Sequence, residues 1–328
     1  MVWLKLAICI IVILFAGQKV AKLGDIIAEK TGAGRVWMGV IAIALITSLP
    51  ELFAGISAVT IVKQPDLTIG NLLGANAFNL LNLALLDIFH RHGSVFTLAS
   101  VSHRVTAWYS LLLLAVVAAG IFVSTNYFSG AIGWIGWYTP VLALLYMFSV
   151  RQIFYYEKSR EKQETELLYE HVASLSRTVF QFVIASIFIV GAGIWLAIIG
   201  DEIAQTTGWG ENFVGSLFLA FTTTLPEIIV SFTALRIGAI DLAVANMIGS
   251  NMFNMMIITV TDLFYTEGPV LAKVSQTNLI IAGAVALMTF LFIAGIRRRF
   301  HRVFRLTWVS LGTIILFLMS AYFTFSLA

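Results

Sequence analysis

The sequence has little charge and a single cysteine. Of its 328 residues, 11% are charged and 59% are hydrophobic, whereas soluble domains carry about 25% charged and about 45–50% apolar residues. One or two cores need far fewer apolar residues than this, so the composition excludes a soluble enzyme. Because Cys9 stands alone, a disulfide framework and a cysteine metal cluster are excluded as well. The net charge of +3 says little about partners, and we expect no nucleic-acid partner.

Long apolar runs account for most of the chain. The first set lies near residues 2–20, 34–62, 67–89, 105–125 and 131–150, and the second near 178–200, 212–237, 240–264, 275–295 and 306–327. A membrane-spanning helix needs about 20 apolar residues. The runs are continuous rather than alternating, which argues against an outer-membrane barrel. We therefore predict an all-α polytopic membrane protein with ten transmembrane helices.

The basic residues predict how the chain is oriented in the membrane. If the N-terminus lies outside, the outer loops hold only Lys5, Lys63 and Lys273, and the remaining 17 of the 20 basic residues face the cytoplasm. Cytoplasmic loops are enriched in Lys and Arg. We therefore expect both termini on the outside of a plasma (inner) membrane, with the lipid bilayer as the surrounding partner.

Two blocks of sequence repeat within the chain. Residues 44–61 resemble 220–237, and residues 66–79 resemble 241–254. Each half contains five predicted spans, and because five is odd the second half enters the membrane inverted. We predict a first repeat over 1–150, a charged cytoplasmic connector over 151–177, and an inverted second repeat over 178–328. Inverted repeats are typical of transporters that bind their substrate near the midplane.

Two glutamates lie deep inside matched apolar spans. Glu51 and Glu227 each follow a proline, Pro50 and Pro226, two of only five prolines in the chain. A proline inside a helix frees a backbone carbonyl oxygen. Carboxylates are costly inside a membrane, and no Lys or Arg is evident at the same depth. We therefore expect these two to need bound cations or protons.

Other polar side chains recur beside the glutamates in both repeats. The candidates are Thr47, Ser48, Asn76, Asn79, Thr223, Thr224, Ser250, Asn251 and Asn254. Their oxygens are hard ligands, which suit Ca²⁺ and alkali cations rather than zinc or copper. Such residues also bridge membrane helices, so a structural role stays open for each hydroxyl and for Asn76 and Asn251.

Two further groups of polar residues favour structural roles. Asp87 and Asp262 are related by the repeat but fall near span ends, where helix capping is favoured over a place at an ion exit. His90, His92 and His103 lie in a predicted cytoplasmic loop. For these histidines we expect a solvated surface rather than a metal site.

The paired motifs resemble the two alpha repeats of the cation/Ca²⁺ exchanger superfamily, with the sodium/calcium exchangers most similar. They are TSLPE (47–51) with GANAFN (74–79), and TTLPE (223–227) with GSNMFN (249–254). The resemblance implies four central ion sites and a core against which residues 1–30 and 178–206 slide. By motif position, the implied ligands are Thr47, Ser48, Glu51, Asn79, Thr223, Thr224, Glu227, Ser250 and Asn254, with the backbone carbonyls of Ala44 and Ala220.

The sequence departs from that family pattern at several positions, including Ile46 and Thr222, where Gly is common. Ala75 stands where Ser is usual, and Asn254 stands where some members have Asp, which leaves two carboxylates. We expect an antiporter that exchanges Ca²⁺ for Na⁺ at a shared site, without a cofactor or an obligate protein partner. The first alternative is a proton-coupled cation exchanger. A cation channel and an intramembrane enzyme are less favoured, since the halves are inverted and no His-Glu-x-x-His pattern is present.

Overall fold

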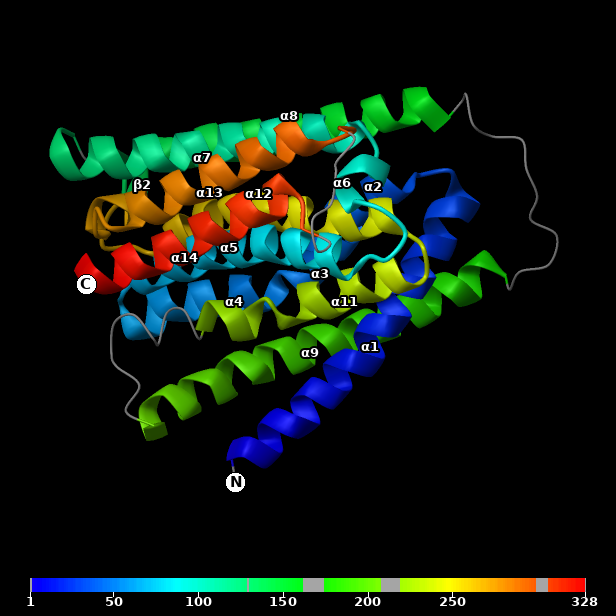
Figure 1. Ribbon diagram of the computed structural model, residues 1–328. Coiled ribbons are helices and arrows are strands. Elements are labelled where there is room, and N and C mark those ends of the chain that lie inside the picture. The colour runs from blue at the N-terminus through cyan, green and yellow to red at the C-terminus, as the bar shows by residue number, and fades with distance from the viewer. Residues whose placement is uncertain (1, 129, 162–173, 208–218, 299–305, 328) are drawn as a thin grey trace.

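The computed structural model describes residues 2–128, 130–161, 174–207, 219–298 and 306–327. Within these ranges the chain is helical apart from its loops and one short hairpin. The helices form an elongated bundle in which most long helices run close to one common direction (Figure 1). This all-α architecture confirms the predicted fold class.

The first repeat contains five long helical regions. Its elements are α1 (Val2–Thr31), α2 (Arg35–Trp37), the π-helix η1 (Met38–Ile43), α3 (Ala44–Thr47), α4 (Leu49–Ser57), the π-helix η2 (Ala58–Val62), α5 (Pro65–Phe89), α6 (Val95–Leu98), α7 (Ser102–Asn126), β1 (Ala131–Ile132), β2 (Ile135–Gly136) and α8 (Tyr138–Glu161). The two strands pair antiparallel.

The second repeat follows the same order. Its described elements are α9 (Leu175–Thr207), helical residues 219–223, α11 (Leu225–Arg236), α12 (Ile240–Phe264), the 3-10 helix η3 (Val270–Lys273), α13 (Asn278–Gly295) and α14 (Trp308–Leu327). In both repeats the second span is interrupted just before a Leu-Pro-Glu sequence.

Seven helical segments in the described ranges are long and apolar enough to cross a membrane. They are Val2–Thr31, Arg35–Val62, Pro65–Phe89, Ser102–Asn126, Leu175–Gly200, Ile240–Phe264 and Asn278–Gly295, and Trp308–Thr324 is a shorter apolar helix. α8 and the segment ending in α11 occupy the other two predicted spans. Each of the ten predicted regions therefore carries helix.

The fifth predicted span begins later than the sequence suggested. Residues 131–136 form the β1–β2 hairpin, and helix starts only at Tyr138. Gly133, at φ 68°, supplies the left-handed turn that joins the strands. α8 continues past 150 to Glu161, and α9 begins at Leu175. Both helices therefore extend into the predicted connector, whose middle lies outside the described residues.

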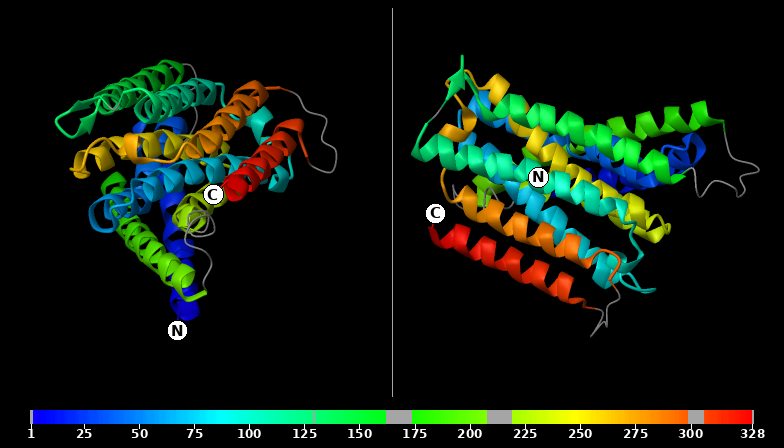
Figure 2. Two further views of the ribbon diagram at one scale, coloured as in Figure 1. Left: turned by 90° about the vertical axis from the view of Figure 1, so that its left-hand side faces the viewer. Right: turned by 90° about the horizontal axis from the view of Figure 1, so that it is seen from above.

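α1 and α9 pack against each other in opposite directions. Near one end Lys5 Nζ lies 2.8 Å from Glu202 Oε2, and further along Cys9 Sγ donates to the carbonyl of Ala192 at 2.9 Å. The pair lies along one side of the bundle, opposite α7 and α8 (Figures 1 and 2). This antiparallel arrangement of matching helices is what inverted repeats require.

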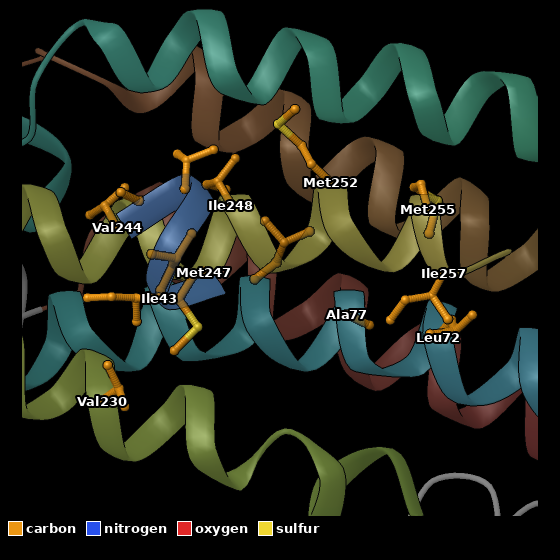
Figure 3. Packing of buried hydrophobic residues seen from close by; sticks show 14 of the residues in the cluster. Ile43, Leu72, Ala77, Val230, Val244, Met247, Ile248, Met252, Met255 and Ile257 are labelled. Atoms are coloured by element: carbon orange, nitrogen blue, oxygen red, sulfur yellow. The ribbon is translucent and has the colours of Figure 1, made fainter. Parts of the chain in front are cut away.

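The centre of the bundle is built around α12, the most buried of the candidate spans. Apolar side chains on its flanks pack against α5 and η1, among them Met247, Ile248 and Ile257 (Figure 3). Gly249 permits a close approach of the two backbones, since an added Cβ would lie 2.5 Å from the Cα of Val40. Small residues at helix crossings allow this contact in membranes.

Asp87 and Asp262 tie helix ends together, as the capping interpretation predicted. Both are fully buried. Asp87 accepts hydrogen bonds from Ser94 Oγ, Val95 N, Thr307 Oγ1 and Ser310 Oγ. Asp262 accepts from Gly136 N, Tyr138 Oη, Thr139 Oγ1 and Val270 N. Each carboxylate is surrounded by donors at the starts of two other elements, so it is stabilised without a cation.

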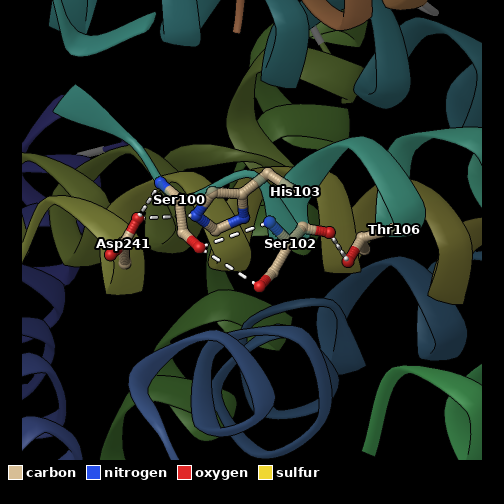
Figure 4. Close-up of polar contacts among 5 residues, drawn as sticks. All are labelled: Ser100, Ser102, His103, Thr106 and Asp241. Atoms are coloured by element: carbon tan, nitrogen blue, oxygen red, sulfur yellow. Dashed lines mark hydrogen bonds and ion pairs between the residues drawn. The ribbon is translucent and has the colours of Figure 1, made fainter. Parts of the chain in front are cut away.

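A second symmetric pair of acids anchors the starts of α5 and α12. Asp241 Oδ1 accepts from Ser100 N at 2.7 Å and lies 2.9 Å from His103 Nε2 (Figure 4). Asp66 Oδ1 accepts from Ser275 N at 2.7 Å and Asn278 Nδ2 at 2.8 Å. His103 is fully buried. The solvated surface expected for it was therefore wrong, because its ring helps to join α7 to α12.

Candidate cation site

The glutamates begin helices that start in the middle of the bundle. α3 ends at Thr47, Ser48 has φ −92° and ψ 7°, and α4 starts at Leu49. The second repeat turns in the same way at Thr224, before α11. Proline is tolerated in a first helical turn because the N–H it lacks has no intrahelical partner there. A helix N-terminus also favours a negative charge, and both glutamates occupy such first turns.

Hydroxyl groups cross between the repeats to reach the two carboxylates. Ser48 Oγ donates to Glu227 Oε1 at 2.8 Å, and Ser250 Oγ lies 3.4 Å from the same oxygen. Thr223, whose hydroxyl donates to the carbonyl of Ala220, lies beside Glu51. Both glutamates are about 1% exposed. The Glu227 carboxylate is therefore held partly by the other half of the chain, and the Glu51 carboxylate lies against it.

Asn76 and Asn251 clasp α5 to α12. Asn76 Nδ2 donates to the backbone carbonyl of Asn251 at 3.3 Å, and Asn251 Nδ2 donates to that of Asn76 at 3.3 Å. Asn251 Oδ1 accepts from Asn79 Nδ2 at 3.0 Å, and Asn76 Oδ1 accepts from Asn254 Nδ2 at 2.9 Å. The donors and acceptors of Asn76 and Asn251 are therefore used within the clasp, which gives these two residues a structural role.

Among the predicted ligands that the structure describes, four buried side-chain oxygens have no hydrogen-bond donor, two from each repeat. They are Glu51 Oε2, Glu227 Oε2, Asn79 Oδ1 and Asn254 Oδ1. Among the ion pairs of the described residues, none involves either glutamate. A buried acceptor without a partner costs about 1–3 kcal/mol, and more when it is charged. Carboxylate and amide oxygens of this kind are ligands that hard cations prefer.

The remaining predicted residues surround these oxygens but are already hydrogen-bonded. Thr47 Oγ1 lies 3.1 Å from the carbonyl of Ile43 and 3.3 Å from that of Ala44. Thr223 and Thr224 both donate to the carbonyl of Ala220, at 3.3 and 2.5 Å. The two alanine carbonyls therefore accept threonine hydroxyls here, and a cation would have to share them.

Asn246, which the sequence favours as a supporting residue rather than a ligand, and Ser231, which was not predicted, support the site. Asn246 accepts from Thr47 at 3.3 Å and donates to Ser231 Oγ at 2.9 Å and to the carbonyl of Glu227 at 3.4 Å. The sequence could have indicated Ser231, because it lies one helical turn after Glu227 and so shares its face.

Together the fold and this centre define a class of protein. It is a polytopic membrane protein of two inverted repeats, in which interrupted helices bring two carboxylates and a set of amide and hydroxyl oxygens together at the repeat interface. The chain belongs to the sodium/calcium exchanger protein family, whose pattern it matches over residues 1–154 and 177–326.

Relatives agree with this assignment over most of their length. The inner membrane protein YrbG of Escherichia coli is 25% identical over 276 residues, covering 81% of this chain and 80% of that protein. The sodium/calcium exchanger MaX1 of Methanosarcina acetivorans is 23% identical, covering 74% and 77%. The solved structure of the sodium-calcium exchanger NCX_Mj, soaked with 100 mM Na⁺ and 10 mM Sr²⁺, shares the fold with a TM-score of 0.71 at 18% identity, covering 97% of this chain and 98% of that one.

Family membership defines the general activity. The chain is a multi-pass membrane transporter of the cation/Ca²⁺ exchanger type and not an enzyme.

Proposed function

We propose that this protein exchanges Ca²⁺ for Na⁺ by alternating access at the candidate site. The single observation that carries the proposal is the set of four unpartnered oxygens, contributed equally by the two repeats. Carboxylate and amide oxygens are typical Ca²⁺ ligands. The proposed ligand set is Thr47, Ser48, Glu51, Asn79, Thr223, Thr224, Glu227, Ser250 and Asn254, with the carbonyls of Ala44 and Ala220.

Charge balance supports obligatory exchange rather than leak. Glu51 and Glu227 together carry two negative charges when ionised, and one Ca²⁺ neutralises both. The empty site would move two desolvated carboxylates through a region of low dielectric, at a cost of several kcal/mol for each ion. Sodium ions in overlapping positions would remove that cost in the return step.

The packing of α1 and α9 supports a sliding motion of these two helices. An added Cβ on Gly193 of α9 would collide with the ring of Pro50. One on Gly17 of α1, at the matching repeat position, would lie 2.9 Å from Ile229. At Gly17 and Gly193 no side chain projects from α1 or α9. The two helices could therefore slide past the first turns of α4 and α11, which carry the glutamates.

Proton coupling is the second candidate. A buried carboxylate oxygen without a donor can accept a proton as well as a cation, which Glu51 Oε2 and Glu227 Oε2 both allow. The exchange would then balance H⁺ against Ca²⁺ at the same two side chains.

The two candidates differ in which gradient drives Ca²⁺. Purified protein in liposomes loaded with Na⁺, at equal pH on both sides, should accumulate ⁴⁵Ca²⁺, and dissipation of the Na⁺ gradient should stop uptake. Uptake that follows an imposed pH gradient and ignores Na⁺ would reject sodium coupling in favour of protons. In either case the double variant Glu51→Gln, Glu227→Gln should abolish uptake, and full activity in that variant would reject the site.

A further inference from the structure

The inverted repeat lets the surroundings of the two glutamates be compared position by position, and they are unequal. Ser250 Oγ lies 3.4 Å from Glu227 Oε1. The matching residue of the first repeat is Ala75, which is fully buried. A methyl group has no lone pair to offer a cation. The Glu51 half therefore lacks one oxygen that the Glu227 half has.

A second difference lies one helical turn away. In the second repeat, Asn246 is satisfied by Ser231 and by Thr47. The matching residue Asn71 is about 1% exposed, and its Oδ1 has no donor. The residue that matches Ser231 is Gly55, so the first repeat has no hydroxyl at this place.

In each repeat one hydroxyl joins the helix that carries the glutamate to the long helix after it. The two repeats supply this hydroxyl from opposite helices of the pair. Ser231 Oγ on α11 donates to the carbonyl of Ala243 on α12 at 3.2 Å. In the first repeat, Thr68 on α5 donates to the carbonyl of Gly55 on α4 at 3.2 Å. The helix contact is therefore kept, but only the second repeat places its hydroxyl beside the supporting asparagine.

The missing hydroxyl oxygen in the Glu51 half affects the binding of a monovalent ion more than that of a divalent ion. A Ca²⁺ between both carboxylates is held mainly by their two charges and by the amide oxygens of both repeats. A Na⁺ in one half is attracted by one carboxylate, so it depends more on each neutral oxygen around it. The Glu227 half has Ser48 and Ser250 within reach of its carboxylate. In the Glu51 half, the neighbouring hydroxyl is that of Thr223, which donates to the carbonyl of Ala220.

We propose that Ala75 makes the site unequal: the Glu227 half binds a Na⁺ of its own, while the Glu51 half does not. Each transport cycle then carries one Na⁺ fewer than a site with a hydroxyl in both halves. This inference rests on the proposed Na⁺/Ca²⁺ exchange. It states that the residues at positions 75 and 250 determine how many Na⁺ ions are exchanged for each Ca²⁺.

A hydroxyl swap tests the inference. The variants are Ala75→Ser, Ser250→Ala and the two combined, each reconstituted in liposomes. The coupling ratio is read, with the membrane potential held at zero, from the Na⁺ gradient at which net ⁴⁵Ca²⁺ flux reverses against a fixed Ca²⁺ gradient. Ala75→Ser should raise the ratio by one Na⁺ per Ca²⁺, Ser250→Ala should lower it by one, and the combined variant should return to the parent value. The Ca²⁺ affinity should change less than about threefold in Ala75→Ser.

The outcomes separate this inference from the proposed function. If the parent shows no Na⁺-driven Ca²⁺ flux, the proposed function fails and the inference with it. If the parent exchanges Na⁺ but its ratio is unchanged in Ala75→Ser, the inference alone is overturned. Should Ala75→Ser fail to fold, Ser250→Ala decides, because it only removes an oxygen. An unchanged ratio in Ser250→Ala would overturn the inference.

Discussion

At the residue scale, identical side chains have different roles because their atoms are used differently. Asn76 and Asn79 lie on one face of α5, a turn apart. The side-chain oxygen of Asn76 accepts from Asn254. The oxygen of Asn79 has no donor. The sequence placed both among the candidates and left a structural role open for Asn76. It could not separate them, because the difference arises from contacts with the opposite repeat.

This contrast predicts different losses on substitution. Asn79→Ala should weaken Ca²⁺ binding about tenfold or more, an effect of at least about 1.4 kcal/mol, because it removes a proposed ligand. Asn76→Ala should mainly lower the thermal midpoint, because it breaks the clasp between α5 and α12. Equilibrium ⁴⁵Ca²⁺ binding and thermal unfolding in detergent measure the two effects. Equal losses of affinity in both variants would contradict the distinction.

At the element scale, the buried carboxylates of Asp87 and Asp262 hold helix ends together, and Gly249 allows α12 to cross close to η1. Proline and the repeated motif predicted where the second span of each repeat is interrupted, because that signal is local. The partners of Ser48 could not be predicted. A residue three positions before Glu51 in an unbroken helix would share the face of that glutamate, but the interruption turns Ser48 toward Glu227 of the other repeat.

Asp87 should be essential for folding and dispensable for ion affinity. Asp87→Ala leaves several buried donors unpaired, which should destabilise the fold by about 3 kcal/mol or more. Asp66→Ala is the matched control at the other end of α5, where the acid is exposed and the loss should be near 1 kcal/mol. Thermal unfolding measures both. A Ca²⁺ affinity lost in folded Asp87→Ala protein would indicate that Asp87 serves the ion path.

The crossing of α12 with η1 should not tolerate a methyl group. Gly249→Ala places a Cβ against the backbone of Val40, so the helices must separate. We expect a loss of about 1–3 kcal/mol, as for other overpacked sites. Gly283→Ala is the control, because no atom lies within 4 Å of the added Cβ. Similar thermal midpoints in the two variants would contradict the close packing.

At the scale of the whole molecule, composition and charge predicted most of the architecture. The continuous apolar runs predicted the membrane-spanning helices. The internal repeat predicted that the second half is inverted, and the antiparallel packing of α1 against α9 agrees with this. The β1–β2 hairpin was missed, because residues 131–136 are as apolar as the helix after them. The orientation in the membrane and the division into 1–150, 151–177 and 178–328 remain predictions from sequence.

Orientation can be tested with reporters fused to the C-terminus. If both termini lie outside, a bacterial strain that carries an alkaline phosphatase fusion should show phosphatase activity, and a green fluorescent protein fusion should stay dark. The same reporters placed after Arg160, in the predicted cytoplasmic connector, should give the opposite pattern. A fluorescent C-terminal fusion would reverse the proposed orientation.

The central claim is that one set of oxygens from both repeats binds Ca²⁺ and Na⁺ in competition. Equilibrium ⁴⁵Ca²⁺ binding to the purified protein over increasing Na⁺ concentrations tests it most directly. The account predicts one Ca²⁺ bound per chain, displaced completely by Na⁺, and no binding in the Glu51→Gln, Glu227→Gln variant. Ca²⁺ binding that survives in that variant, or that Na⁺ does not displace in the parent protein, would contradict it.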